Sequence, residues 1–161
     1  MSKSQTFNPF TQQDSHTEII ASQLFGQIIA ARDEAKRGGI IDEQLFNDRL
    51  NHMFTAGYLL GYVDTCLESI CNNDIERKKD AQAIFEKLFP GSGNGFIKSK
   101  LIARQQAASL PETNDNYQEI VNECRAFDTG MSLSEEEVLK YLANQAKAPN
   151  RLKEFLLIGE I

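Results

Sequence analysis

The chain has 161 residues, of which 41% are hydrophobic and 25% charged, and its formal net charge is −6 at pH 7. A domain of this size buries enough apolar surface to fold without disulfides or a metal, and the composition excludes a disordered chain. The net negative charge argues against tight, non-specific binding of nucleic acid. We expect residues 1–14 to be a flexible N-terminal lead-in and residues 15–161 to form a single all-α domain.

The apolar pattern predicts a protein without a membrane segment. The first fourteen residues lack the apolar stretch of a secretory signal. The most apolar run, from Met53 to Val63, is shorter than the roughly 20 residues that cross a bilayer. The three cysteines are odd in number and have no disulfide-framework spacing. We therefore expect a cytoplasmic protein that does not associate with membranes.

The first two helices are predicted by their end signals. Ser15 to Glu18 has the form of a capping box, and the glycine pair at 38–39 is expected to end the helix that follows. Asp42 is suited to cap a second helix, which the apolar pattern extends to about residue 71. Apolar residues cover nearly every face of this second helix, which indicates a central helix surrounded by others. Gly57 and Gly61 lie on one side of it and predict a closely packed neighbouring helix.

Further helices are predicted over the second half of the chain. One is expected at 74–88, followed by a glycine-rich loop and a helix at 96–109. A fifth helix is expected to begin at 114 or 115 and to end at Gly130, and a sixth to begin at a capping box at 134–137. A last short helix is expected to start at Asn150. Because no segment alternates with a period of two, we predict no sheet and a compact orthogonal or irregular bundle of six to seven helices around the central helix at about residues 42–71.

No motif identifies a catalytic residue, a cofactor site or a metal site. The loop from Gly91 to Ser99 superficially resembles a phosphate-binding loop, but two residues separate its last glycine from Lys98 and a helix precedes it. Cys66 and Cys71 are five residues apart, and zinc ligands favour spacings of two to four. We therefore expect no cofactor and no metal, and the sequence does not predict an enzyme.

Three groups of residues are nevertheless candidates for binding. Carboxylates one helical turn apart, close in sequence to two tyrosines, suggest a pocket near the central helix (Tyr58, Tyr62, Asp64 and Glu68). The helix at 96–110 carries three cations and no acid, which could contact a phosphate backbone (Lys98, Lys100 and Arg104). The segment from 111 to 139 holds eight acidic residues and one basic residue, and seven of these acids are candidates for contact with a partner (Glu112, Asp115, Glu119, Glu123, Glu135, Glu136 and Glu137).

These groups support three functional hypotheses. The first is a non-enzymatic protein-binding module, such as an adaptor, chaperone-like subunit or inhibitor, that acts through an acidic and apolar helical surface on a protein partner or on a second copy of itself. The second is a regulator that contacts nucleic acid through the basic helix at 96–110, which the net charge disfavours. The third is a small-ligand-binding bundle or small enzyme with a pocket near the central helix.

Overall fold

The computed structural model describes residues 16–39, 42–145 and 147–161, and within these ranges it contains helices and no strand. The helices, in chain order, are α1 (His16–Gly38), α2 (Glu43–Leu50), α3 (Met53–Glu68), α4 (Asp74–Leu88), α5 (Gly93–Ala107), α6 (Tyr117–Leu142) and α7 (Arg151–Ile158). This confirms the predicted all-α class. The predicted lead-in at 1–14 and Ser15 of the first capping box lie outside the described residues.

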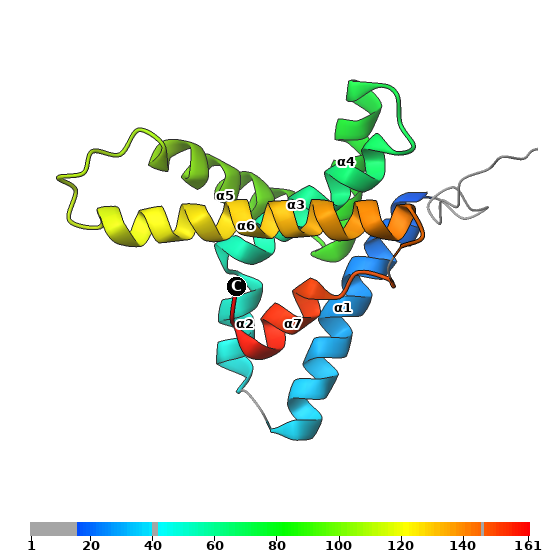
Figure 1. Ribbon diagram of the computed structural model, residues 1–161, viewed down its shortest axis with the longest axis horizontal. Coiled ribbons are helices and arrows are strands. Elements are labelled where there is room, and N and C mark those ends of the chain that lie inside the picture. Colours follow the sequence, from blue (N-terminus) through cyan, green and yellow to red (C-terminus); the bar gives the residue numbers. More distant parts are fainter. Residues whose placement is uncertain (1–15, 40–41, 146) are drawn as a thin grey trace, which may run out of the picture.

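The core is built around α3. Thirteen of its sixteen residues are buried, which explains why apolar side chains occupy nearly every face of this segment. The long helix α6 crosses the whole molecule alongside α3, while α1, α2 and α7 lie on one side of this pair and α4 and α5 reach to the other (Figure 1). The central pair therefore lies between two groups of helices.

Glycines allow α3 and α6 to approach closely. A Cβ atom added to Gly57 would lie 2.0 Å from the carbonyl oxygen of Phe127, and one added to Gly61 would lie 2.6 Å from that of Met131. Gly130 makes the reciprocal approach from α6, since its Cβ would lie 2.3 Å from the carbonyl oxygen of Phe54. No side chain fits between the backbones at these positions, which confirms that Gly57 and Gly61 face a neighbouring helix.

The predicted central helix is interrupted at residues 51 and 52 and is corrected to two helices, α2 and α3. Asn51 ends α2, and its side-chain amide donates to the carbonyl of Asn47 at 2.8 Å. His52 adopts an extended conformation (φ −74°, ψ 155°), and its Nδ1 accepts a hydrogen bond from the amide of Phe54. The carbonyl of Asn47 also accepts from the backbone amide of Asn51, so the Asn51 side chain adds a second hydrogen bond there, whereas the His52 ring supplies the acceptor that the Phe54 amide would have in an unbroken helix.

The predicted helices ending at Gly130 and beginning at Ser134 are one continuous helix, α6. Gly130 does not end it, because the missing side chain is used for the contact with α3. Ser134 is fully buried, and its hydroxyl donates to the carbonyl of Met131 within the same helix, so it does not cap a new one. Glycine and serine here mark a close helix crossing where the sequence predicted helix ends.

The remaining boundaries follow the sequence more closely. Asp42 caps α2 by accepting from the amide of Leu45 at 2.7 Å, α4 begins at the predicted residue, and α7 begins at Arg151, one residue after the predicted start. Helix α5 starts at Gly93, three residues before the predicted start, because Gly93 packs directly on the backbone of Phe85 in α4. The connection between α4 and α5 is therefore a tight turn, which holds the two helices side by side.

No helix in the described part of the chain combines the length and the apolar character needed to cross a membrane. The most apolar helix, α3, has only sixteen residues. Its apolar composition is explained by its enclosure within the bundle.

Candidate functional site

The two tyrosines of the predicted pocket are core residues. Tyr58 and Tyr62 are both fully buried. The Tyr58 hydroxyl donates to Glu137 Oε1 at 2.6 Å, and the Tyr62 hydroxyl donates to Gln23 Oε1 at 2.5 Å. Burial is the main reason that the pKa of each phenol is raised well above its usual value. Both hydroxyls remain protonated at physiological pH and hold helices together.

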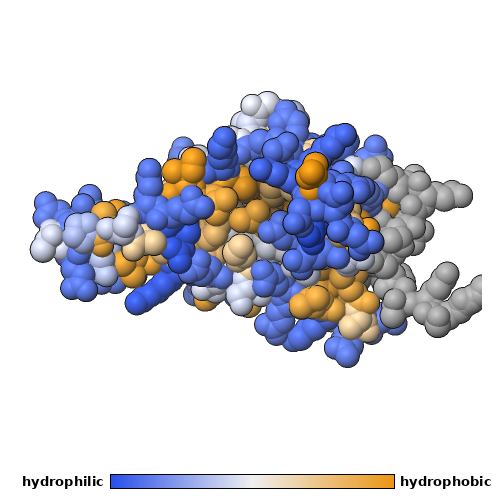
Figure 2. All heavy atoms as spheres, turned by 90° about the horizontal axis from the view of Figure 1, so that it is seen from above, coloured by the Kyte–Doolittle hydropathy of each residue, from blue (hydrophilic) through white to orange (hydrophobic). Residues whose placement is uncertain are grey.

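A groove opens on the other side of α3, where α4 and α5 flank it, and we call it the α3–α5 groove. It has a volume of about 640 Å³. Its apolar lining is buried or half-buried and consists of Leu60, Leu67, Ala81, Phe85, Ile97 and Leu101. Figure 2 looks onto the side of the molecule where α4 and α5 lie and shows apolar side chains exposed within a hydrophilic surround. Asp64 and Glu68 belong to this groove, so the structure separates them from Tyr58 and Tyr62.

The two edges of the α3–α5 groove carry opposite charges. Asp64 and Glu68, both exposed, stand on the side formed by α3. The sides formed by α4 and α5 carry exposed Lys78 and Lys98, and Arg77, which forms an ion pair with Asp74. An apolar bottom with opposite charges along its edges is a surface that a segment with matching charges can recognise.

The negative charge on the acidic side of the groove is only partly compensated within the fold. The pKa of Asp64 is raised, first by the partial desolvation of its carboxyl group, then by the negative charges of Glu68 and of Glu135 on α6, and the charge of Arg77 offsets this only in part. Asp64 is therefore exposed to the negative charge of two further carboxylates, one from α3 and one from α6. A positively charged group placed beside Asp64 would be attracted by all three.

This pKa shift predicts a pH-dependent effect of Asp64 on stability. Because the folded pKa is above the unfolded one, the folded state binds more protons, and stability falls as pH rises from the unfolded value of about 3.8 through the folded value. Asp64→Asn should therefore stabilise the protein at neutral pH and have little effect at about pH 3, where the carboxyl is protonated in both states. Urea unfolding at both pH values measures the difference. The matched control is Asp33→Asn at an exposed position on α1, and an equal response of both variants would contradict the prediction.

The acidic residues of 111–139 do not form one surface. Glu112 and Asp115 lie in the exposed connection between α5 and α6, and Glu119 and Glu123 are exposed on the first turns of α6. On the second half of α6, Glu135 lies close to Asp64, and Glu136 pairs with Lys140 at 2.8 Å. The candidate partner-binding acids are thus spread over the connection before α6 and over α6 itself, and of these Glu135 acts on the groove residue Asp64 through its charge.

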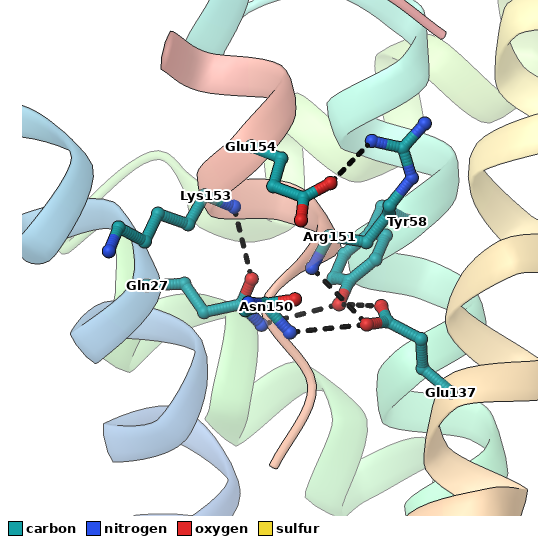
Figure 3. A network of polar contacts seen from close by, with 7 residues as sticks. All are labelled: Gln27, Tyr58, Glu137, Asn150, Arg151, Lys153 and Glu154. Atoms are coloured by element: carbon teal, nitrogen blue, oxygen red, sulfur yellow. Dashed lines mark hydrogen bonds and ion pairs between the residues drawn. The ribbon is translucent and has the colours of Figure 1, made fainter. Parts of the chain in front are cut away.

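Glu137, a further member of that group, is engaged within the fold. Its Oε1 accepts from the hydroxyl of Tyr58, and its Oε2 accepts from the backbone amides of Asn150 and Arg151 at 3.1 and 3.3 Å. Gln27 extends this network by donating to Tyr58 and accepting from the amide of Lys153 (Figure 3). The network joins α1, α3, α6 and the N-terminus of α7, so Glu137 is not offered to a partner.

The three cations of α5 do not form a common phosphate-binding surface. Lys98 lines the groove, and the ammonium of Lys100 lies 5.8 Å from the ring centroid of Phe96. Arg104 forms a bidentate ion pair with Asp128 of α6, in which Nε and Nη2 each lie 3.0 Å from a carboxylate oxygen. A carboxylate thus occupies the position that a phosphate would need on Arg104.

The structure also brings together three residues that the sequence did not group. His16 Nε2 donates to Asp80 Oδ2 at 2.8 Å, and the Cys71 thiol donates to the same oxygen at 3.6 Å. These residues come from the start of α1, from the segment after α3 and from α4. Their separation along the chain leaves no spacing motif, so no local signal in the sequence could have found them.

The groove and this three-residue cluster both bring together side chains from several helices and both include groups that solvent can reach. Neither a protein-family model, nor a curated protein, nor a solved structure was found to match the chain.

Proposed function

We propose that this chain is a non-enzymatic binding module that holds an amphipathic helical segment of a partner protein in the α3–α5 groove. The observation that carries the proposal is the combination of an apolar lining from three helices with charged groups along the edges. Grooves of this kind bind the apolar face of a helix, which inserts side chains spaced at i, i+3 or i+4, and i+7. The volume of about 640 Å³ accommodates several such side chains.

The charges define the partner more closely. The three carboxylates Asp64, Glu68 and Glu135 favour a segment with Lys or Arg along the edge that lies against α3. Lys78 and Lys98 favour acidic groups on the opposite edge. The expected partner is therefore an amphipathic helix with a basic edge next to its apolar face, on another protein.

The two other functions have less support. A nucleic-acid regulator would need cations free to contact phosphates, and Arg104 is bound to Asp128. A small-ligand site is favoured by one observation, since the groove volume falls within the roughly 300–1,000 Å³ typical of ligand pockets. A thermal-shift screen of metabolites measures this alternative, and a ligand present at about 100 times its Kd should stabilise by about 2.7 kcal/mol.

A selection experiment tests the proposal directly. A displayed library of helical peptides of about 15 residues, some four turns, is selected on the whole protein. The enriched peptides should share the apolar i, i+3 or i+4, i+7 pattern with Lys or Arg beside it. Failure to enrich any amphipathic pattern would contradict the proposal.

Two substitutions on α5 locate the binding site of the selected peptides. Leu101→Glu puts a charge into the groove at a half-buried position, and we expect it to weaken binding at least tenfold, or by about 1.4 kcal/mol. Ile102→Glu makes the same change at the next residue, which is 42% exposed and does not line the groove, and should leave binding unchanged. Fluorescence anisotropy measures both, and equal binding by the Leu101→Glu variant and the unmodified protein would refute the location.

A further inference from the structure

Three residues with metal-binding side chains converge outside the α3–α5 groove. His16 lies in the first turn of α1, Cys71 follows α3, and Asp80 lies in the middle of α4. Cys71 is buried, whereas the side chains of His16 and Asp80 are 32% and 18% exposed. The cluster is therefore closed on the protein side and open to solvent on the other, so an ion can enter.

The distances between the donor atoms suit a small metal ion. All three ligand atoms lie within 4.8 Å of one another. Around tetrahedral zinc, with metal–ligand distances of roughly 2.0–2.3 Å, an imidazole nitrogen and a carboxylate oxygen stand about 3.4 Å apart, and a thiolate sulfur and that oxygen about 3.6 Å apart. The Cys71 Sγ to Asp80 Oδ2 distance is already 3.6 Å, and the His16 Nε2 to Asp80 Oδ2 distance of 2.8 Å needs to open by a fraction of an ångström.

The donor types narrow the choice of metal. One thiol, one imidazole and one carboxylate form a mixed sulfur, nitrogen and oxygen set, which suits zinc. Magnesium and calcium prefer sites made of oxygen ligands alone. Three protein ligands also leave one position of a tetrahedral ion for a water molecule.

We infer that His16, Cys71 and Asp80 form a binding site for a single zinc-class divalent ion. On binding, the Cys71 thiol releases its proton to solvent and its sulfur coordinates the metal, while neutral His16 and ionised Asp80 each contribute one atom. The hydrogen bonds from His16 and Cys71 to Asp80 are replaced by bonds to the ion. Because the ligands come from three segments, the metal links the start of α1 to α4 and to the segment that follows α3, and it stabilises the folded state.

The site is tested with the untagged full chain and two metal probes. Titration with Co²⁺ should produce a thiolate-to-metal charge-transfer band that saturates at about one equivalent, and Zn²⁺ should displace the cobalt. Zinc should also raise the melting temperature, and a chelator should reverse the rise. Absence of the charge-transfer band, or binding that does not saturate near one equivalent, would overturn the inference.

Variants distinguish this site from adventitious binding. Cys71→Ser and Asp80→Asn should each lower zinc affinity by more than about a hundredfold. A loss of about a hundredfold is the most that is expected when the removed residue only hydrogen-bonds to a metal ligand, so a larger loss indicates a direct ligand. Cys124→Ser alters another cysteine, one that is only partly buried, and should leave affinity and the cobalt band unchanged. Circular dichroism verifies the fold of each variant, and Asp80→Asn keeps the inference testable if the Cys71 variant unfolds. Retention of the cobalt band in both ligand variants would overturn the inference.

Discussion

Gly57→Ala should lower the free energy of unfolding by about 3 kcal/mol, the upper end of the typical cost of overpacking. The added Cβ would stand 2.0 Å from the carbonyl oxygen and 2.8 Å from the carbonyl carbon of Phe127. These are backbone atoms, so no side chain can rotate away, and α6 must shift as a whole. Urea unfolding measures the loss.

Gly26→Ala is the matched control. Gly26 lies inside α1, and a Cβ added there meets nothing within 4 Å. Alanine has a higher helix propensity than glycine by about 1 kcal/mol, so this variant should be more stable than the unmodified protein. Opposite signs at the two glycines are the expected result. A Gly57→Ala variant as stable as the Gly26→Ala variant would mean that α3 and α6 do not meet as described.

Glu137→Ala should destabilise the protein by a similar amount, about 3 kcal/mol. The Tyr58 hydroxyl, fully buried, would lose its acceptor, which costs about 1–3 kcal/mol. The amides of Asn150 and Arg151 at the start of α7 would lose theirs, which adds about 1 kcal/mol, the value of a helix cap. Denaturant unfolding with a double-mutant cycle to Tyr58→Phe measures the coupling between the two side chains.

The adjacent residue supplies the control for this prediction. Glu136→Ala removes an exposed carboxylate that pairs with Lys140 one turn away, so its effect should be much smaller. If the Glu136 and Glu137 variants were equally stable, or if Glu137 and Tyr58 showed no coupling, the network in Figure 3 would not hold α7 against the core.

Much of the fold is predictable because single helices carry their own signals. The apolar pattern around residue 58 indicates burial on every face, and glycines four apart indicate a close helix crossing. The break at His52 could not be predicted in the same way. The break depends on the Asn51 side chain at the end of α2 and on the His52 side chain at the start of α3. Asparagine and histidine also occur inside helices, so their presence does not mark a break.

The glycine that α6 contributes to the crossing also has two possible readings in the sequence. Gly130 was expected to end a helix, since glycine commonly follows a helix end. In the structure it lies inside α6 and against the backbone of Phe54. The sequence alone does not show whether a glycine ends a helix or allows two helices to pack closely.

The candidate site was predictable only in part. Asp64 and Glu68 share one side of α3, as their spacing predicted. Tyr62 and Asp64 are two residues apart, or about 200° around a helix, and so point in nearly opposite directions, which helical geometry alone could have revealed. The groove itself needs α4 and α5 beside α3, and the zinc-class cluster needs α1 beside α4. Such tertiary neighbours have no signature in a single sequence.

The most direct test of the central claim is a structure of the protein bound to a selected amphipathic peptide, by crystallography or by intermolecular nuclear Overhauser effects. We expect the apolar side chains of the peptide to contact Leu60, Ile97 and Leu101, with a Lys or Arg of the peptide beside Asp64. A peptide bound on any other face, or bound in the α3–α5 groove with its acidic edge along α3, would contradict this account.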